Sequence, residues 1–332
     1  MAFLTLILSL LAILIFCELF TNAVEWLGKN LDFGHSVVGS VFSAVSTALP
    51  ETIVPIIALL TLPSFTSREE IGIGAILGAP LMLSTLTFSL LALPTYFRNS
   101  NKVLTFKREP LLLDMKFFIL NFSLALLISI FAKNLKSLLS IFFLLSYLIY
   151  LYFIFKKDEG FEEEELKALL FSRSKEPTTF IIFLQLGIGL SGILLSSYFF
   201  VTSIESLAKI IGINPFIISV VLTPIATELP EKFNSITWVI KGKDHLAISN
   251  ITGAMVFQSS FPIIFGLILS TWNLDEKALK LCLITIISSL YLYFLIRRGF
   301  IKPKFLLFNF ILYILYILLS LNLSLNFEVF HL

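Results

Sequence analysis

Long apolar stretches restrict the fold of this chain more than any other feature of its sequence. Ten of them have about the 20 residues that a helix needs to cross a bilayer. They lie near residues 3–24, 36–62, 69–93, 112–132, 135–155, 178–201, 215–240, 245–270, 279–296 and 304–323. Only 14% of the residues are charged and 57% are hydrophobic, whereas a soluble domain carries about 25% charged residues. We therefore predict an all-α polytopic membrane protein with ten transmembrane helices, and we exclude a soluble enzyme or a nucleic-acid-binding protein.

The lysines and arginines predict how the bundle is oriented. The odd-numbered loops between the ten segments hold 17 of these residues, and the even-numbered loops hold 6. Because cytoplasmic loops are enriched in lysine and arginine, we expect a multi-pass protein of the cell membrane with both termini outside the cytoplasm. The longest polar segment, 156–177, is then a cytoplasmic linker. It separates a first half, 1–155, from a second half, 178–332, and each half has five predicted helices.

An internal repeat relates the two halves. A shift of 180 residues aligns 3–58 with 183–238 without a gap, and 16 of the 56 pairs are identical. Because five is an odd number of helices, the second copy enters the membrane from the opposite side, so we expect two inverted five-helix repeats. In secondary transporters of this architecture the substrate site lies near the midplane, on interrupted helices at corresponding positions of the two repeats.

Two corresponding segments, in 36–62 and 215–240, have the features of such interrupted helices. Their shared residues are Thr47, Pro50 and Glu51 in the first and Thr227, Pro230 and Glu231 in the second. Each proline lacks the N–H that would bond the carbonyl four residues earlier, so it interrupts the helix and frees that carbonyl. Each threonine lies four residues before its glutamate, which places the hydroxyl and the carboxylate on one helical face.

The oxygen atoms of these two segments favour a site for a divalent cation. A charged side chain at the bilayer centre costs about 2.5–3.5 kcal/mol on insertion scales, and such residues are functional candidates. Two glutamates, hydroxyls and freed carbonyls suit Ca²⁺, which takes roughly 6–8 oxygen ligands in flexible geometry. The alternative is a pair of proline-kinked helices whose glutamates bond to neighbours, but the duplication in register favours the ion site.

Both segments, with the Gly-x-x-x-Gly helices that follow them, resemble the alpha repeats of the cation/calcium exchanger superfamily, which includes the Na⁺/Ca²⁺ exchangers. The resemblance covers both halves, with repeat regions at about 36–93 and 215–270. The site that it implies has central Ca²⁺ ligands at Glu51 and Glu231, ion-facing threonines at Thr47 and Thr227, and main-chain ligands at the carbonyls of Ala44 and Pro224.

The chain departs from the family pattern where the family supplies Na⁺ ligands. The motif serines, asparagine and final acid or amide are replaced at Ala48, Ala79, Leu83, Glu228, Ala254 and Gln258. Glu228 and Gln258 still carry side-chain oxygens and stay candidate metal ligands. The losses in the first repeat weaken the case for Na⁺ coupling more than the case for the central divalent site.

Glu228 and Lys232 leave three interpretations open. They are four residues apart, so they can pair on one helical face. In the first interpretation Glu228 is a third ligand carboxylate or a protonatable coupling group. In the second it neutralises Lys232, which would otherwise be an unpaired cation in the membrane. In the third, Lys232 is an internal cation that replaces a bound Na⁺.

From these residues and this resemblance we predict a secondary antiporter, not an enzyme, that exchanges Ca²⁺ or a related divalent cation for Na⁺ by alternating access. Coupling to H⁺ is the alternative, and a degenerate channel or structural member represents a different class. The expected partners are inorganic cations and the lipid bilayer. We expect no cofactor and no obligate protein partner.

Overall fold

The computed structural model describes residues 2–30, 49–98, 102–157, 168–172 and 176–329, and most of this part is helical. Its elements, in chain order, are α1 (Ala2–Asn30), α4 (Leu49–Thr61), α5 (Phe65–Met82), the π-helical turn η2 (Leu83–Thr87), α6 (Phe88–Leu90), α7 (Ala92–Phe97), β1 (Leu104–Thr105), α8 (Arg108–Phe131), the 3-10 turn η3 (Lys133–Leu135), α9 (Lys136–Lys157), α10 (Thr179–Ile211), α11 (Pro215–Thr227), α12 (Leu229–Ile240), α13 (Asp244–Gln258), α14 (Phe261–Leu269), α15 (Glu276–Ile296), β2 (Phe300–Ile301) and α16 (Pro303–Val329).

Eight of the ten predicted spans have a counterpart among the described residues. Eight helical segments there are long and apolar enough to cross a membrane, so the chain is a multi-pass integral membrane protein. The predicted span 36–62 begins outside the described residues. The predicted span 215–240 is divided at Glu228 into α11 and α12. Ten helices in two inverted repeats therefore stay a prediction.

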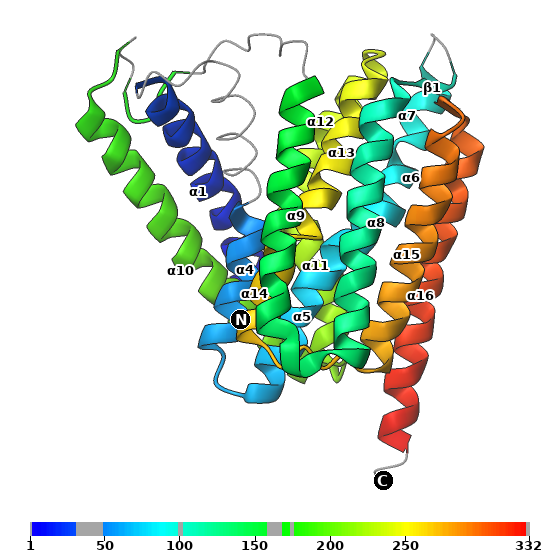
Figure 1. Cartoon of the computed structure of the whole chain (residues 1–332). Helices are drawn as coiled ribbons and strands as arrows, with labels where there is room; N and C mark the ends of the chain where they lie inside the picture. Colours follow the sequence, from blue (N-terminus) through cyan, green and yellow to red (C-terminus); the bar gives the residue numbers. More distant parts are fainter. Residues whose placement is uncertain (1, 31–48, 99–101, 158–167, 173–175, 330–332) are drawn as a thin grey trace.

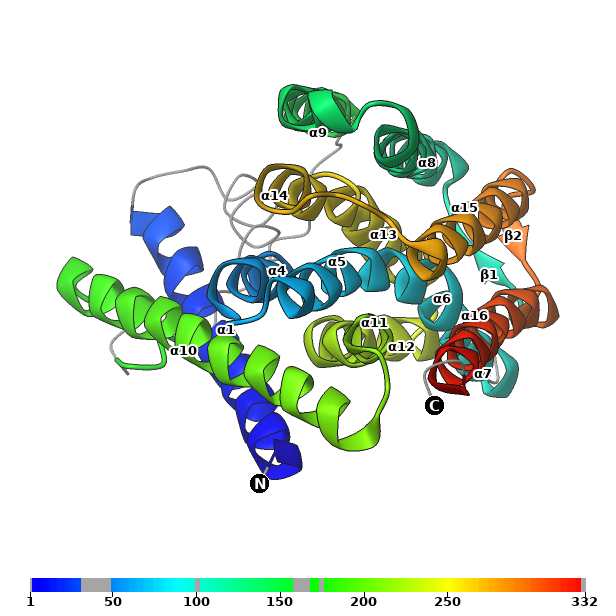
Figure 2. The same ribbon diagram turned by 90° about the horizontal axis from the view of Figure 1, so that it is seen from below.

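The helices form a central layer with three groups around it. Viewed from below, α4, α5 and α11–α14 lie in the middle; α8 and α9 lie on one flank, α15 and α16 on another, and α1 crosses α10 on the third (Figure 2). Burial decreases from the central layer outward. In the most apolar 18 residues of each span, 83% are buried in Phe65–Phe97 and 67% in Asp244–Leu269, against 22% in α1. The spans that belong to the predicted repeat regions are thus the ones most enclosed by protein.

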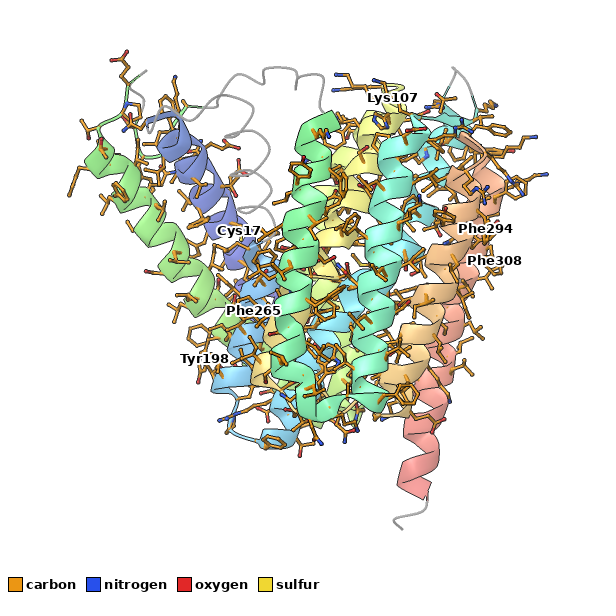
Figure 3. The ribbon with its side chains drawn as sticks, in the orientation of Figure 1. Cys17, Lys107, Tyr198, Phe265, Phe294 and Phe308 are labelled. Carbon is orange, nitrogen blue, oxygen red and sulfur yellow. The ribbon has the colours of Figure 1, made fainter. Side chains whose placement is uncertain are left out.

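The outer helices present apolar side chains to their surroundings. Phe294 on α15, Phe308 on α16 and Tyr198 on α10 are exposed, and they lie on the outer sides of these helices (Figure 3). In water such a surface would be costly, but lipid tails are as apolar as leucine. The exposed aliphatic and aromatic surface is therefore what a bilayer-embedded perimeter requires.

Two glycines allow α5 to cross α11 at close range. A Cβ atom on Gly74 would lie 2.8 Å from the Phe216 carbonyl oxygen, and a Cβ on Gly78 would lie 2.6 Å from the Val220 carbonyl oxygen. Any other residue would force the helices apart, which is the reason that small residues four apart mark close helix contacts in membranes. The Gly-x-x-x-Gly pattern of the first half thus contacts a helix of the second half, next to Pro224.

A buried ion pair joins elements at the end of the central layer that is uppermost in Figure 1. Arg98, which follows α7, donates to both carboxylate oxygens of Asp244 at the start of α13, and it also bonds the Val103 and Val239 carbonyls at 2.7 and 3.1 Å. The backbone N–H of Thr105 donates to the same carboxylate at 2.9 Å. These groups hold α7, the short strand β1 and α13 together, beside the antiparallel pairing of β1 with β2.

Polar contacts between α1 and α10 gather toward one end of this helix pair. The Gln185 amide donates to Asn22 Oδ1 at 2.9 Å, and the Asn30 amide donates to Thr179 Oγ1 at 3.0 Å. The side chains of Asn22 and Gln185 also bond the backbone of the segment 168–172, which precedes α10. Farther along the two helices, apolar side chains such as Ile13 and Phe200 belong to one buried cluster.

Candidate ion-binding site

The second repeated segment is an interrupted helix, as its proline predicts. α11 ends at Thr227 and α12 begins at Leu229. Glu228 lies between them, and its backbone N–H donates to the Pro224 carbonyl at 2.9 Å. That carbonyl, predicted as a main-chain ligand, therefore has one of its two lone pairs engaged and the other available. Pro230 has no N–H to donate to the carbonyl of Ala226, so the helical hydrogen bonding is interrupted at this point.

Glu228 lies at the centre of a buried polar network. The residue is almost completely buried, at 1% exposure. The Gln258 amide donates to Glu228 Oε1 at 2.7 Å, and Lys232 Nζ lies 3.4 Å from Glu228 Oε2. The structure thus brings three of the predicted residues together, two from the interrupted helix and one from the end of α13.

The network continues from Lys232 to α13. Lys232 Nζ donates to Asn250 Oδ1 at 3.2 Å, and the Ser235 hydroxyl donates to the same oxygen at 3.2 Å. Lys232 is 2% exposed and belongs to the largest fully buried side chains in the described part of the chain. A buried charge is tolerated only when it is paired and hydrogen-bonded, and both conditions hold here.

Thr227 lies next to this network on α11. It is buried, and its hydroxyl donates to the Thr223 carbonyl at 3.2 Å. Thr223 Oγ1 is 3.2 Å from Ser219 Oγ, and the Ser219 hydroxyl donates to the Ile71 carbonyl on α5 at 2.7 Å. Since the proton of Thr227 points back along its own helix, the lone pairs of its oxygen are directed away and can accept a bond or a cation.

The predicted site residues of the first repeat are described only in part. Pro50 and Glu51 are buried in the first turn of α4, and Glu51 is 5% exposed. Thr47 and Ala44 lie outside the described residues. In the second repeat, the backbones of Pro230 and Glu231 belong to α12, but their side chains also lie outside the description. Within the described residues, no group of three or more His, Cys, Asp or Glu side chains could hold a metal ion.

The first repeat differs from the second in its following helix. There the replaced asparagine position, Leu83, opens the π-helical turn η2. The carbonyl of Ser84 in this turn accepts bonds from the Ser288 hydroxyl at 2.7 Å and from the Asn309 amide at 2.9 Å. The turn is thus held by α15 and α16, and the side chain of Leu83 is fully buried and apolar.

Asp114, like Asp244, is a buried carboxylate that was not among the predicted site residues. Asp114 on α8 is 4% exposed. It accepts hydrogen bonds from the Tyr150 hydroxyl at 3.1 Å and from the Thr252 hydroxyl at 2.6 Å. Thr252 is two residues from Asn250, so Asp114 contacts the face of α13 opposite the Lys232 network. Its position inside the predicted span 112–132 could have identified it from the sequence, because an acid within a span is a functional candidate.

The sequence is similar to one family model and to two known proteins. The family model described as sodium/calcium exchanger protein matches two segments of the chain, 1–156 and 181–322. Inner membrane protein YrbG of Escherichia coli (strain K12) is 26% identical over 272 residues, which cover 79% of this chain and 77% of YrbG. Putative antiporter CaxA of Alkalimonas amylolytica is 31% identical over 91 residues, which cover 27% of this chain and 28% of CaxA.

Solved structures share the fold. The H⁺/Ca²⁺ exchanger CAX has a TM-score of 0.74 at 20% identity, over 97% of this chain and 87% of CAX. The sodium-calcium exchanger NCX_Mj has a TM-score of 0.57 at 21% identity, over 96% of this chain and 99% of NCX_Mj. The helical bundle with its buried charged network is thus a multi-pass membrane protein with an exchanger fold. By its match to the family model, the chain belongs to the sodium/calcium exchanger family.

Proposed function

We propose that this chain is a secondary active antiporter that exchanges Ca²⁺, or a related divalent cation, for Na⁺ by alternating access. The observation that carries the proposal is the buried network of Glu228, Gln258 and Lys232 at the break between α11 and α12. Ionisable groups inside a membrane are costly and mark ion pathways. Membership of the exchanger family supports the same conclusion.

The ion binds between the two interrupted helices. Glu51 and Glu231 provide the central carboxylates, Thr47 and Thr227 provide hydroxyl oxygens, and Ala44 and Pro224 provide main-chain carbonyls. The burial of Glu51 and Thr227, at 5% and 4% exposure, supports this assignment because an occluded ion needs ligands shielded from water. Hard oxygen ligands of this kind select Ca²⁺ over softer metals.

The two halves, 1–155 and 178–332, are inverted repeats that alternate access to this site. The division of the family match into 1–156 and 181–322 supports two related halves. The first residues of α1 and the last residues of α16 lie in the lower half of the view in Figure 1, and the segment 168–172 lies at the upper end. That arrangement fits five helices in each half, with the linker 156–177 in the cytoplasm and both termini outside.

Coupling to H⁺ is the second candidate, and two residues favour it. The buried side chain of Leu83 has no oxygen to offer a monovalent ion, and Gln258, whose Nε2–H donates to Glu228 Oε1, offers one neutral amide oxygen and no charge. Both residues occupy positions where the family supplies Na⁺ ligands. Carboxylates can exchange protons with no dedicated ligand shell, so loss of these ligands affects Na⁺ more than H⁺.

Transport by purified protein in vesicles tests the proposal. We expect ⁴⁵Ca²⁺ uptake driven by an outward Na⁺ gradient or by a pH gradient, and the comparison of the two gradients identifies the coupling ion. Glu51→Gln and Glu231→Gln each remove a charged ligand, so uptake should fall by about tenfold or more, since bonds to charged groups contribute about 1.5–3 kcal/mol. Glu205→Gln is a matched control, because Glu205 is buried on α10 and bonds Ser67 and Lys209.

Two results would overturn the proposal. Absence of exchange with any divalent cation by folded wild-type protein would remove the antiporter function. Full activity in both the Glu51 and the Glu231 variants would remove the site assignment. Equal losses in the Glu205 control would show that the effect of the site variants comes from folding and not from ion binding.

A further inference from the structure

Lys232 places its ammonium group inside the protein. It lies eight residues before the end of α12 at Ile240, which is about 12 Å along a helix at 1.5 Å per residue. Lysines near helix ends extend their ammonium groups to the membrane surface, but from this position the side chain is too short. Its ammonium group instead lies between Glu228 on its own segment and Asn250 on α13.

The lysine and Glu228 form a buried ion pair. Glu228 Oε2 is 3.4 Å from Lys232 Nζ, and both side chains are 2% exposed. If either side chain moved into solvent, the other charge would stay buried without its partner, which is strongly unfavourable. The pair adds no net charge to the site, although Glu228 alone would add one negative charge.

The charges that remain can be counted from the sequence. Apart from residues at the ends of the predicted spans, the central segments 36–62, 69–93, 215–240 and 245–270 carry four ionisable residues, which are Glu51, Glu228, Glu231 and Lys232. With Glu228 and Lys232 paired, two negative charges are left for transported ions. One divalent cation neutralises them, and so do two monovalent cations.

We propose that Lys232 is a resident cation that occupies one positive-charge position of the site, so that the protein exchanges one divalent cation for two monovalent cations without net charge movement. This inference rests on the proposed antiporter function and specifies its stoichiometry. It follows from the contacts of Lys232 with Glu228 and Asn250 and from the charge count of the central segments. Removing the ammonium group vacates its position for an additional monovalent cation from solution.

Flux at a controlled membrane potential tests the stoichiometry. Wild-type protein in vesicles is driven by whichever gradient, Na⁺ or H⁺, supports ⁴⁵Ca²⁺ uptake, and K⁺ with valinomycin sets the potential. We expect the equilibrium ⁴⁵Ca²⁺ ratio to be independent of the potential. If one net charge moved in each cycle, the equilibrium ⁴⁵Ca²⁺ ratio would instead change tenfold for about every 59 mV of membrane potential.

Three variants separate charge from packing. In Lys232→Met we expect uptake to become potential-dependent, or to require a small monovalent cation in the external solution that contains ⁴⁵Ca²⁺. In the second case, Na⁺ or Li⁺ would support uptake and choline would not. In Glu228→Gln the ammonium group is unpaired and uptake should fall at least tenfold. The double variant Glu228→Gln/Lys232→Met restores two negative charges and should return to potential-independent uptake. Lys209→Met is the control, since Lys209 pairs with Glu205 in the same four-residue spacing on α10, outside the site.

The outcomes distinguish this inference from the proposed function. No exchange by wild type means that the antiporter proposal fails. Exchange by wild type that follows the imposed potential means that the function stands and the resident-cation inference is wrong. The inference is also wrong if Lys232→Met folds, transports, and keeps potential-independent uptake with no requirement for a monovalent cation on the calcium side. Stabilisation of Lys232→Met, but not of wild type, by Na⁺ or Li⁺ in thermal unfolding would support it without any transport measurement.

Discussion

The close crossing of α5 and α11 predicts that one added methyl group at Gly78 destabilises the protein. In Gly78→Ala the added Cβ would lie 2.6 Å from the Val220 carbonyl oxygen, 2.8 Å from Val220 Cα and 3.1 Å from Pro224 Cγ. Ordinary contact begins at about 3.4 Å, so the helices must separate by about 0.8 Å at this point. Overpacking of this kind costs about 1–3 kcal/mol.

A second glycine provides the matched control. Beyond its chain neighbours and the nearby backbone of its own helix, a Cβ atom on Gly187 of α10 would meet no described atom within 4 Å, so Gly187→Ala changes helix propensity without a clash. Alanine is favoured over glycine in a helix by about 1 kcal/mol, and both variants share that gain. The difference between them therefore isolates the cost of separating α5 from α11, which we expect to be about 1–3 kcal/mol.

Thermal unfolding of the purified variants in detergent measures this difference. We expect Gly78→Ala to unfold at a lower temperature than wild type, and Gly187→Ala to unfold at the same or a higher temperature. Because Pro224 borders the crossing, ⁴⁵Ca²⁺ uptake by Gly78→Ala should also require more Ca²⁺ for half-maximal rate. If the two variants unfold at the same temperature and take up Ca²⁺ equally well, the glycine does not set the distance between the helices.

Two buried carboxylates outside the site give further predictions. Asp114→Asn replaces an acceptor of two hydroxyl protons, from Tyr150 and Thr252, by a group with only one acceptor oxygen, so thermal unfolding should show a loss of about 1–3 kcal/mol. An unchanged unfolding temperature would mean that Asp114 does not anchor α13. Asp244→Asn leaves the buried guanidinium of Arg98 without its charged partner, so we expect a loss of about 3–5 kcal/mol. Partial recovery in Asp244→Asn/Arg98→Met would identify the unpaired charge as the cause, whereas no loss in the single variant would contradict it.

Features with a local cause could be predicted from the sequence. Uninterrupted apolar runs predicted the spans that contain α1, α8, α9, α10, α15 and α16, because a membrane span needs only length and hydropathy. The interruption at Glu228 was also predictable, since Pro230 lacks a donor for the carbonyl four residues earlier. The pairing of Glu228 with Lys232 was one of the three interpretations that their four-residue spacing left open, and the structure shows the two side chains in contact.

Features that depend on distant partners could not be predicted. The Gly74–Gly78 pattern indicates close packing, but it does not say that the partner is α11, more than 130 residues later in the chain. The bond of Gln258 to Glu228 joins two helices whose relative rotation no sequence pattern specifies. The π-helical turn at Leu83 has no distinctive residue type, and it is held by Ser288 and Asn309 from helices far along the chain.

The unequal distribution of polar contacts along α1 and α10 determines how this helix pair can come apart. At one end, the amides of Asn22 and Gln185 bond each other, and both also bond the backbone that leads into α10. Toward the other end, side chains such as Ile13 and Phe200 meet through dispersion contacts, which have no directional bond to break. The pair can therefore splay from its apolar end while its polar end acts as a pivot, and thinning or thickening of the surrounding bilayer would change the splay angle before it changed the hydrogen bonds.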